Sequence, residues 1–259
     1  MAIKGIIFDL DGTIYRGNER IQGAINTIEV LEDLDIDIRY FSNNPTKSQT
    51  DYAAHLETFG ISVSPEAILS AGTVTTQYLT TNHPEDPIFL IGSAGLREQL
   101  QTAGLSVIDD PTDATVLVAS FDRQFNYSDM VAGYRALQTG ATFYGTDPDM
   151  IIPTENGMIP GSGAIINAIG GIADTSPKKI LGKPSPEAQD AVLSTLSCEA
   201  AECLVVGDRL QTDIALGTNA GMQTALVTTG VATASDIDEQ AVTPDYVIDS
   251  VADVPTLIP

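Results

Sequence analysis

Short runs of apolar, often β-branched residues alternate with amphipathic stretches along the whole chain, and this alternation constrains the fold more than any other feature. Such runs are expected to form strands at residues 3–8, 36–41, 88–91, 116–119, 141–144, 204–206, 225–227 and 246–248. The stretches between them are expected to form helices at residues 21–34, 47–59, 96–103, 127–138, 164–172 and 186–196. Strands that alternate with helices build parallel sheets covered by helices. The sequence therefore predicts an α/β fold with mostly parallel sheets.

Polar clusters follow three of these expected strands, at residues 9–13, 42–44 and 207–209. Ligands of open parallel sheets bind at the carboxyl ends of the strands, so these clusters contain candidate site residues. Lys183 is a fourth candidate, because it directly precedes the helix start that Ser185 and the following Pro and Glu predict.

The middle of the chain differs from the two ends. Residues from about 75 to 176 contain their own strands and helices but none of the polar clusters. A length of 259 residues is enough for two domains. We therefore expect a core domain built from residues 1–75 and 177–259, with residues 76–176 inserted as a second α/β domain.

Acidic residues greatly outnumber basic ones, with 35 Asp and Glu against 12 Lys and Arg and a formal net charge of −23. Because 43% of the residues are hydrophobic, the chain can fill a core, and the excess acid is expected to coat a folded surface. Such a surface repels nucleic acid and anionic membranes, so neither is expected as a partner. We interpret this composition as the surface of a halophilic cytoplasmic protein, with an ordinary acidic enzyme as the alternative.

No segment of the sequence predicts export or insertion into a membrane. The apolar run near the N-terminus is too short for a signal peptide, and no run of 18 apolar residues follows. A cytoplasmic location is expected, and a homo-oligomeric state is left open. Cys198 and Cys203 match neither a redox motif nor a zinc-binding pair, so two free thiols are expected.

Asp9 and Asp11 are the first candidates for chemistry. Asp9 follows an apolar strand, where a carboxylate is costly unless it is paired or binds a cation. Asp11 follows two residues later, before a turn at Gly12, and two carboxylates this close favour a divalent metal or a shared proton. A simple turn capped by Asp9 is the alternative.

Asp208 also follows a strand, and nothing local requires a charge there. Together with Asp9 it would offer oxygen ligands suited to Mg²⁺. Asp213 is expected to open a helix at residues 213–220, where the helix dipole favours an acid. Asp213 therefore has a structural explanation that Asp208 lacks.

Ser42, Asn43 and Lys183 are candidates for binding an anion. Hydroxyl and amide donors at a helix start can hold phosphate oxygens, although an ordinary helix cap explains Ser42 and Asn43 equally well. Lys183 lies between Gly182 and Pro184 in a chain with five lysines, which distinguishes it from an ordinary surface lysine.

Taken together, the order and spacing of these residues resemble the haloacid dehalogenase-like phosphatases. The Asp-Leu-Asp-Gly-Thr segment at residues 9–13 is similar to their first motif, Ser42 to the second and Lys183 to the third. Asp208, after Gly207, and Asp213 are similar to the fourth motif. The resemblance covers essentially the whole chain and implies a Rossmann-like parallel-sheet core with an inserted α/β cap domain.

The inserted part resembles the cap of the NagD-like branch, which contains sugar-phosphate and para-nitrophenyl-phosphate phosphatases. This resemblance rests on residues 143–149, 152–154 and 160–165. The chain departs from the pattern at Asp147, where the branch usually carries Asn. Asp122, Arg123 and Asp147 are candidate contacts to the substrate, with ordinary loop polarity as the alternative explanation.

The resemblance implies that the chain hydrolyses a small phosphorylated metabolite. In this mechanism Asp9 attacks phosphorus and forms an aspartyl phosphate. Asp11 protonates the leaving oxygen and then activates the attacking water. Ser42, Asn43 and Lys183 neutralise charge on the transferring oxygens.

The resemblance also implies Mg²⁺ as the cofactor, held by the Asp9 carboxylate, the Asp11 backbone carbonyl and Asp208. Asp213 would act through water or by orienting its neighbours. A haloacid dehalogenase is disfavoured, because such an enzyme needs no acid at the position of Asp11. A phosphotransferase or phosphomutase on the same core and a non-catalytic sugar-phosphate binding protein stay as alternatives.

Overall fold

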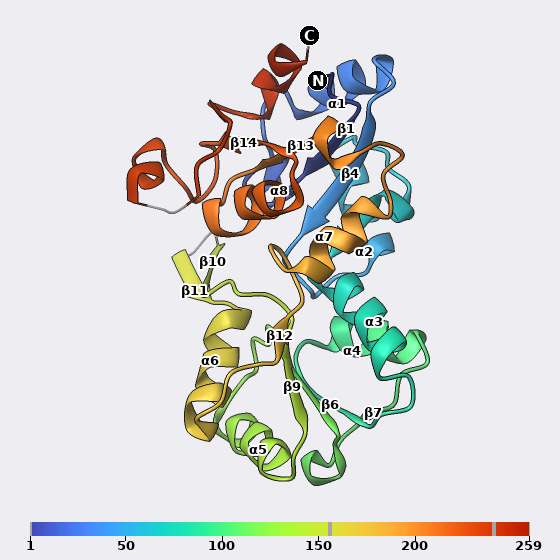
Figure 1. Ribbon diagram of the computed structural model, residues 1–259, viewed down its shortest axis with the longest axis vertical. Coiled ribbons are helices and arrows are strands. Elements are labelled where there is room, and N and C mark those ends of the chain that lie inside the picture. Colours follow the sequence, from blue (N-terminus) through green and yellow to red (C-terminus); the bar gives the residue numbers. More distant parts are fainter. Residues whose placement is uncertain (1, 155–156, 240–241, 259) are drawn as a thin grey trace. The chain divides into compact units, whose positions relative to one another are not determined.

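The larger sheet of the computed structural model combines strands from both ends of the chain, drawn in blue to teal and in orange to red in Figure 1. Its strand order is β15-β14-β13-β1-β4-β5. These strands are β1 (Gly5–Phe8), β4 (Asp37–Ser42), β5 (Ile68–Ser70), β13 (Cys203–Gly207), β14 (Gln223–Val227) and β15 (Tyr246–Ile248). β1 pairs in parallel with both β13 and β4, so Phe8 lies opposite Val206 and Tyr40. The residues that follow these three strands therefore emerge at one edge of the sheet.

Helices cover this sheet, and the strands beneath them are apolar. The helices are α1 (Ala24–Asp33), α2 (Gln49–Thr58), α7 (Pro186–Leu193) and α8 (Ala215–Ala220). All residues of β1 and β13 are buried, as expected for central strands of a parallel sheet covered on both faces. The Ser185 side chain caps α7 by accepting from the backbone N–H of Ala188, and Pro186 fits the first helical position.

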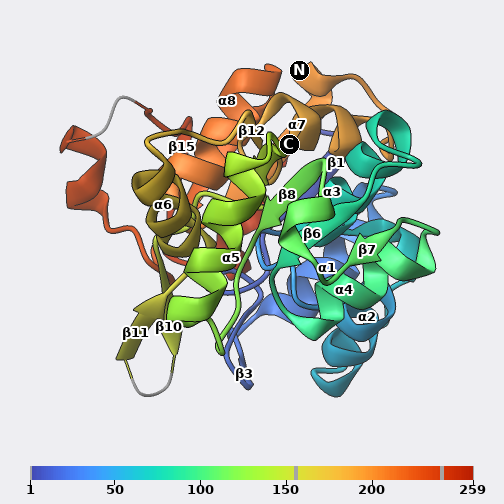
Figure 2. The same cartoon turned by 90° about the horizontal axis from the view of Figure 1, so that it is seen from below.

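A second sheet is parallel throughout and has the strand order β12-β9-β8-β6-β7. Its strands are β6 (Ile88–Ile91), β7 (Val107–Ile108), β8 (Val116–Ala119), β9 (Thr142–Gly145) and β12 (Lys179–Ile180). Its helices are α3 (Ala71–Asn82), α4 (Ala94–Thr102), α5 (Tyr127–Gln138) and α6 (Ser162–Ala173). Figure 2 shows α5 and α6 side by side, and both contact β8.

Short elements complete the chain, of which the structure describes residues 2–154, 157–239 and 242–258. Two antiparallel hairpins are β2 (Tyr15–Arg16) with β3 (Glu19–Arg20), and β10 (Ile151–Thr154) with β11 (Gly157–Pro160). Short helical segments are η1 (Pro65–Ala67), η2 (Pro111–Asp113), η3 (Ala200–Glu202), η4 (Leu210–Ile214), η5 (Ala234–Glu239) and η6 (Val251–Leu257). No helix among the described residues is long and apolar enough to span a lipid bilayer.

The chain divides into two compact units, one around each sheet. The first contains Met1–Ser42, Gln49–Leu69 and Lys183–Pro259, and the second contains Asn43–Ser48 and Ser70–Gly182. The second unit is wider than the expected insertion at residues 76–176. It includes all of α3, which begins at Ala71, and β12, which pairs with β9 after residue 176.

The physical reasons for this difference lie in both elements. The sequence of α3 is rich in Thr, which has a modest helix propensity, and a capping box between Ser70 and Thr73 fixes its start. β12 has only two residues, too few for a periodic pattern. The predicted α/β class with parallel sheets is confirmed. The boundaries of the expected elements differ by a few residues, and α3, β5 and β12 were not among the expected elements.

The net charge of −23 predicts that stability depends strongly on salt. Raising KCl from 0.05 to 3 M should raise the melting temperature, because the Debye length falls from about 30 Å at 0.01 M to about 3 Å at 1 M and like charges are screened. Thermal unfolding at fixed pH and fixed free Mg²⁺ measures the effect. A melting temperature that stays constant or falls would contradict the halophilic interpretation.

Candidate active site

Asp9 and Asp208 emerge from neighbouring strands at the carboxyl edge of the first sheet. Asp9 follows β1, and its backbone N–H donates to Val206 O on β13 over 2.9 Å. Asp208 follows Gly207, the last residue of β13. The two side chains are 9% and 1% exposed, so both carboxylates are largely removed from water. The parallel register of β1 and β13 thus places two buried acids side by side.

Two glycines make room for the Asp208 carboxylate. A Cβ on Gly12, which has a φ of 97°, would lie 2.5 Å from Asp208 Oδ2, and a Cβ on Gly230 would lie 1.8 Å from it. The backbone N–H of Val231 donates to the same oxygen over 2.7 Å. Gly230 and Val231 were not among the expected site residues. A Gly shortly after the strand expected at residues 225–227 is the sequence signal that could have indicated them.

Asp213 lies in a single π-helical turn, η4, and not at the start of a longer α-helix as expected. The backbone N–H of Ile214 donates to Arg209 O over 3.2 Å, the i to i+5 bond of this turn. The backbone N–H of Arg209 in turn donates to Asp213 Oδ2 over 3.1 Å. α8 begins only at Ala215, so the helix predicted at residues 213–220 is wrong by two residues and Asp213 is oriented by the turn that precedes it.

Lys183 contacts two of the acids in this region, Asp9 and Asp213. It is 2% exposed, and its Nζ donates to Asp9 Oδ1 over 2.8 Å and to Asp213 Oδ1 and Phe41 O over 2.6 Å each. Burial alone would lower the pKa of Lys183, but Asp213 and Asp9 outweigh it and raise the pKa above its ordinary value. Lys183 is therefore a fixed positive charge at neutral pH.

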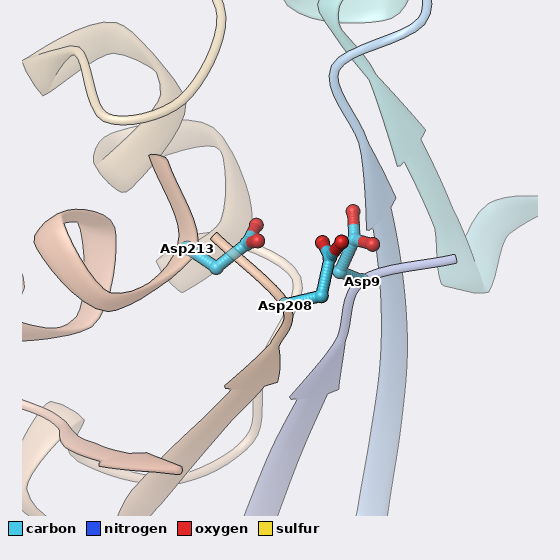
Figure 3. Close-up of side chains that lie close together, drawn as sticks. All are labelled: Asp9, Asp208 and Asp213. Atoms are coloured by element: carbon cyan, nitrogen blue, oxygen red, sulfur yellow. The ribbon is translucent and has the colours of Figure 1, made fainter. Parts of the chain in front are cut away.

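Asp9, Asp208 and Asp213 form an acidic cluster (Figure 3), in which one carboxylate oxygen of each residue lies within 4.8 Å of the others. Burial, followed by the charge of Asp213, raises the pKa of Asp208 to about 7. Burial and the charges of Asp213 and Asp208 likewise raise the pKa of Asp9, against the opposing effect of Lys183. Three buried carboxylates around one ammonium leave an excess of negative charge, and hard oxygen donors of this kind fit Mg²⁺.

Ser42 and Asp11 occupy the same edge of the sheet but differ in exposure. Ser42 is the last residue of β4 and is 5% exposed, whereas Asp11 is exposed and lies outside the acidic cluster. The Tyr52 hydroxyl donates to Ser42 Oγ over 3.2 Å from the buried face of α2. Sequence reasoning missed Tyr52, because an aromatic residue in an amphipathic helix is usually a core residue.

The other expected contacts belong to the second unit. Asn43 lies against Gly182, where a Cβ would be 2.8 Å from Asn43 Oδ1. Arg123 is exposed and lines a cavity of about 370 Å³ together with Phe121, Asp122, Phe125, Ile159, Pro160 and Ile165. Asp147 is buried after β9, separate from that lining. The structure thus brings together Asp9, Asp208, Asp213 and Lys183, and it assigns Arg123 and Asp147 to different places in the second unit.

Asp147 has hydrogen bonds that suit either a carboxyl or an amide group. Thr146 Oγ1 donates to its Oδ2 over 3.0 Å, and the backbone N–H of Asp149 donates to its Oδ1 over 3.3 Å. The side chain is 2% exposed, and burial together with the charge of Asp149 raises the pKa of Asp147 to about 7. Ionised Asp147 therefore destabilises the folded protein.

Asp147→Asn should stabilise the protein more at pH 8 than at pH 5. Because the pKa of Asp147 is higher in the folded than in the unfolded state, the free energy of unfolding falls as pH rises from about 4 to about 7. The uncharged amide avoids this loss, so Asp147→Asn should raise the free energy of unfolding by about 2–4 kcal/mol at pH 8. Urea unfolding at pH 5, 6, 7 and 8 measures the difference, with Asp109→Asn at an exposed position as the matched control. An effect of Asp147→Asn on stability that is equal at all four pH values would contradict the raised pKa of Asp147.

Comparisons with known proteins agree with this geometry. The family described as haloacid dehalogenase-like hydrolase matches residues 6–106, and a second hydrolase family of the same type matches residues 180–254. Acid sugar phosphatase of Staphylococcus epidermidis is 34% identical over 243 residues, which cover 94% of this chain and 93% of that protein.

Solved structures give the same result. p-Nitrophenyl phosphatase from Archaeoglobus fulgidus is 34% identical with a TM-score of 0.93, covering 100% of both chains. NagD from E. coli K-12 is 28% identical with a TM-score of 0.87, covering 98% of both chains. The chain therefore belongs to the haloacid dehalogenase-like hydrolases. Within them it falls in the NagD-like branch and is an enzyme of the phosphatase type.

Proposed function

We propose that this protein is a Mg²⁺-dependent phosphatase that hydrolyses a small phosphomonoester, a sugar phosphate or similar metabolite, by transferring the phosphoryl group to Asp9 and then to water. The observation that carries the proposal is the buried contact of Asp9 with Lys183 over 2.8 Å, beside Asp208 and Asp213. The names of the relatives, acid sugar phosphatase and p-nitrophenyl phosphatase, support this substrate class.

Asp9 is suited to be the nucleophile because it is fixed. Lys183 holds its Oδ1, and Thr13 Oγ1 donates to its Oδ2 over a longer distance of 3.4 Å. Fixing the attacking carboxylate before substrate binds lowers the entropic part of the barrier. The ammonium of Lys183 also neutralises negative charge that arrives with the phosphoryl group, which is usually a dominant effect in phosphoryl transfer.

Asp11 is suited to move protons. Its side chain is exposed, unlike those of Asp9 and Asp208, so it can exchange protons with water and with a leaving group. The Gly12 N–H donates to Tyr15 O over 2.7 Å, and this turn follows Asp11 directly. In the proposal Asp11 protonates the leaving oxygen and later accepts a proton from the attacking water.

The Asp9 carboxylate, the Asp11 backbone carbonyl and Asp208 would hold Mg²⁺. The ion would supply positive charge that stabilises the phosphoryl oxygens. Asp213 is not one of these ligands in the proposal, because its two oxygens already accept from Lys183 Nζ and from the Arg209 N–H. We propose that Asp213 orients the Lys183 ammonium.

A panel of phosphorylated metabolites and p-nitrophenyl phosphate tests the proposal. Inorganic phosphate should be released from p-nitrophenyl phosphate and from at least one sugar phosphate in the presence of Mg²⁺. Addition of alcohol or sugar acceptors separates hydrolysis from transfer. Phosphate that appears on an acceptor instead of in solution, or no turnover of any ester in the panel, would contradict the proposal.

Tyr52→Phe should weaken catalysis moderately through Ser42. The hydroxyl of Tyr52 fixes Ser42 Oγ, and loss of one neutral hydrogen bond costs about 0.5–1.5 kcal/mol, or about two- to tenfold in kcat/KM. Tyr40→Phe, a change of the same size at a buried position on β4, is the matched control. Equal kinetic effects of the two changes would show that Tyr52 has no particular relation to Ser42.

A further inference from the structure

The two cysteines of the chain touch each other in the first unit, although their spacing in sequence matches no redox motif. Cys198 Sγ and Cys203 Sγ are 3.4 Å apart, with both side chains present as free thiols. Cys203 is buried at the first position of β13, and Cys198 is partly exposed in the segment that precedes η3. The two thiols are free, as expected, and the structure adds that their sulfur atoms lie in contact.

Gly5 on the neighbouring strand β1 makes the space for both sulfur atoms. It lies opposite Cys203 in the parallel register, and a Cβ at this position would be 2.7 Å from Cys198 Sγ and 3.2 Å from Cys203 Sγ. Any residue with a side chain at position 5 would push the sulfurs away. The contact between the thiols therefore depends on the local sequence of two adjacent strands.

The chain on either side of Cys198 is held in place. Ser197 donates to Asp37 Oδ2 from both its backbone N–H, over 3.0 Å, and its hydroxyl, over 2.9 Å. Cys203 Sγ lies 3.3 Å from Glu199 O, to which its thiol donates. Reacting groups that are already held in contact gain a high effective concentration, so a bond between them forms readily.

We propose that Cys198 and Cys203 are a modification site that closes to a reversible intramolecular disulfide in the presence of a low-molecular-weight disulfide such as glutathione disulfide. The Cys198 thiolate attacks one sulfur of the oxidant and releases the other half as a thiolate. Cys203 gives its proton to that thiolate, and its sulfur then attacks Cys198 Sγ and expels the second half. Two protein thiols are oxidised, and the oxidant is reduced to two thiols.

The environment of the two sulfurs assigns the order of these steps. Burial, followed by the hydrogen bond with Cys198, raises the pKa of Cys203 to about 12, so this thiol is a poor first nucleophile. Cys198 is the more accessible of the two. Cys203 therefore acts as the resolving thiol.

The pair lies at the amino end of β13, whereas Asp208 follows the carboxyl end of the same strand. The four residues of β13 that separate Cys203 from Asp208, residues 204–207, are all buried. Oxidation should therefore cross-link the segment around Cys198 to the first sheet and leave the acidic cluster unchanged. Hydrolysis by the oxidised protein should stay within about twofold of the reduced protein, because distant sites contribute independently.

Intact-mass measurement of the full chain after treatment with excess glutathione disulfide, acid quench and alkylation tests the proposal. The wild-type protein should lose two hydrogens and take up no alkyl group, and dithiothreitol should restore two alkylatable thiols. Cys203→Ala should keep one glutathione adduct, because the resolving thiol is missing. Cys198→Ala, which leaves the buried position unchanged, should form almost no adduct.

Three results would overturn the proposal. After treatment with glutathione disulfide, the wild-type protein could keep two alkylatable thiols. It could instead retain a glutathione adduct, as is expected of Cys203→Ala, or it could form disulfides between two protein molecules. Rapid adduct formation in Cys198→Ala would overturn the order of the steps. A large loss of phosphate release on oxidation would contradict the expectation that the disulfide leaves the acidic cluster unchanged.

Discussion

Replacement of Asp9 by Asn is expected to lower kcat for p-nitrophenyl phosphate by at least about 10³-fold while the protein still folds. An amide keeps the shape of the side chain but cannot attack phosphorus. Burial raises the pKa of Asp9, so the uncharged amide should leave stability unchanged or raise it slightly. Initial rates and thermal unfolding of the same preparation measure both effects.

Asp109→Asn is the matched control for Asp9→Asn. It removes the same charge at a side chain that is 96% exposed and separate from the acidic cluster. Its turnover should equal that of the wild-type protein. Turnover of Asp9→Asn close to that of Asp109→Asn would show that Asp9 is not the nucleophile.

Removal of divalent cations is expected to lower turnover by on the order of 10²–10³-fold, and added Mg²⁺ should restore it. The reason is the excess negative charge of Asp9, Asp208 and Asp213, which Lys183 alone does not balance. Rates are measured after exhaustive chelation, then after addition of Mg²⁺ in excess of the chelator. Full activity in excess chelator would contradict the assignment of the cluster as a metal site.

Binding of the metal can also be measured without turnover, through the melting temperature. An ion that binds only the folded protein raises the melting temperature. Mg²⁺ should therefore raise the melting temperature of the chelated wild-type protein and of Asp109→Asn, and it should have much less effect on Asp208→Asn. An equal shift in all three proteins would place the ion elsewhere.

The strand ends could be predicted from sequence because apolar runs and the polar residues after them are both local signals. Asp9 follows β1 and Asp208 follows β13 as expected, and the register of a parallel sheet then places them together. The same reasoning singled out Lys183 as a candidate, through its place before the helix start at Ser185, and its Nζ lies against Asp9. For these residues, local sequence and topology were sufficient.

Other features depend on contacts that local sequence does not encode. Gly230 and Val231 hold Asp208 from a loop after a different strand, β14, and only the tertiary structure reveals that approach. Asp213 departs from the predicted helix start, because a π-turn closes its hydrogen bond from residue i to i+5, one residue further than an α-helix, and the residue pattern of a single turn does not show this difference. Cys198 and Cys203 meet through space opened by Gly5, on a strand almost 200 residues away in sequence.

The most direct test of the central claim is to look for a phosphoryl group on Asp9 in the Asp11→Asn variant. Without Asp11, activation of water should fail, whereas attack on p-nitrophenyl phosphate should continue because nitrophenolate leaves without strong acid assistance. Rapid mixing should give a burst of one nitrophenolate per enzyme, and acid-quenched peptide mapping should find the phosphate on Asp9. Nitrophenolate and free phosphate that appear together from the first turnover, with no phosphate on the Asp9 peptide, would contradict the account.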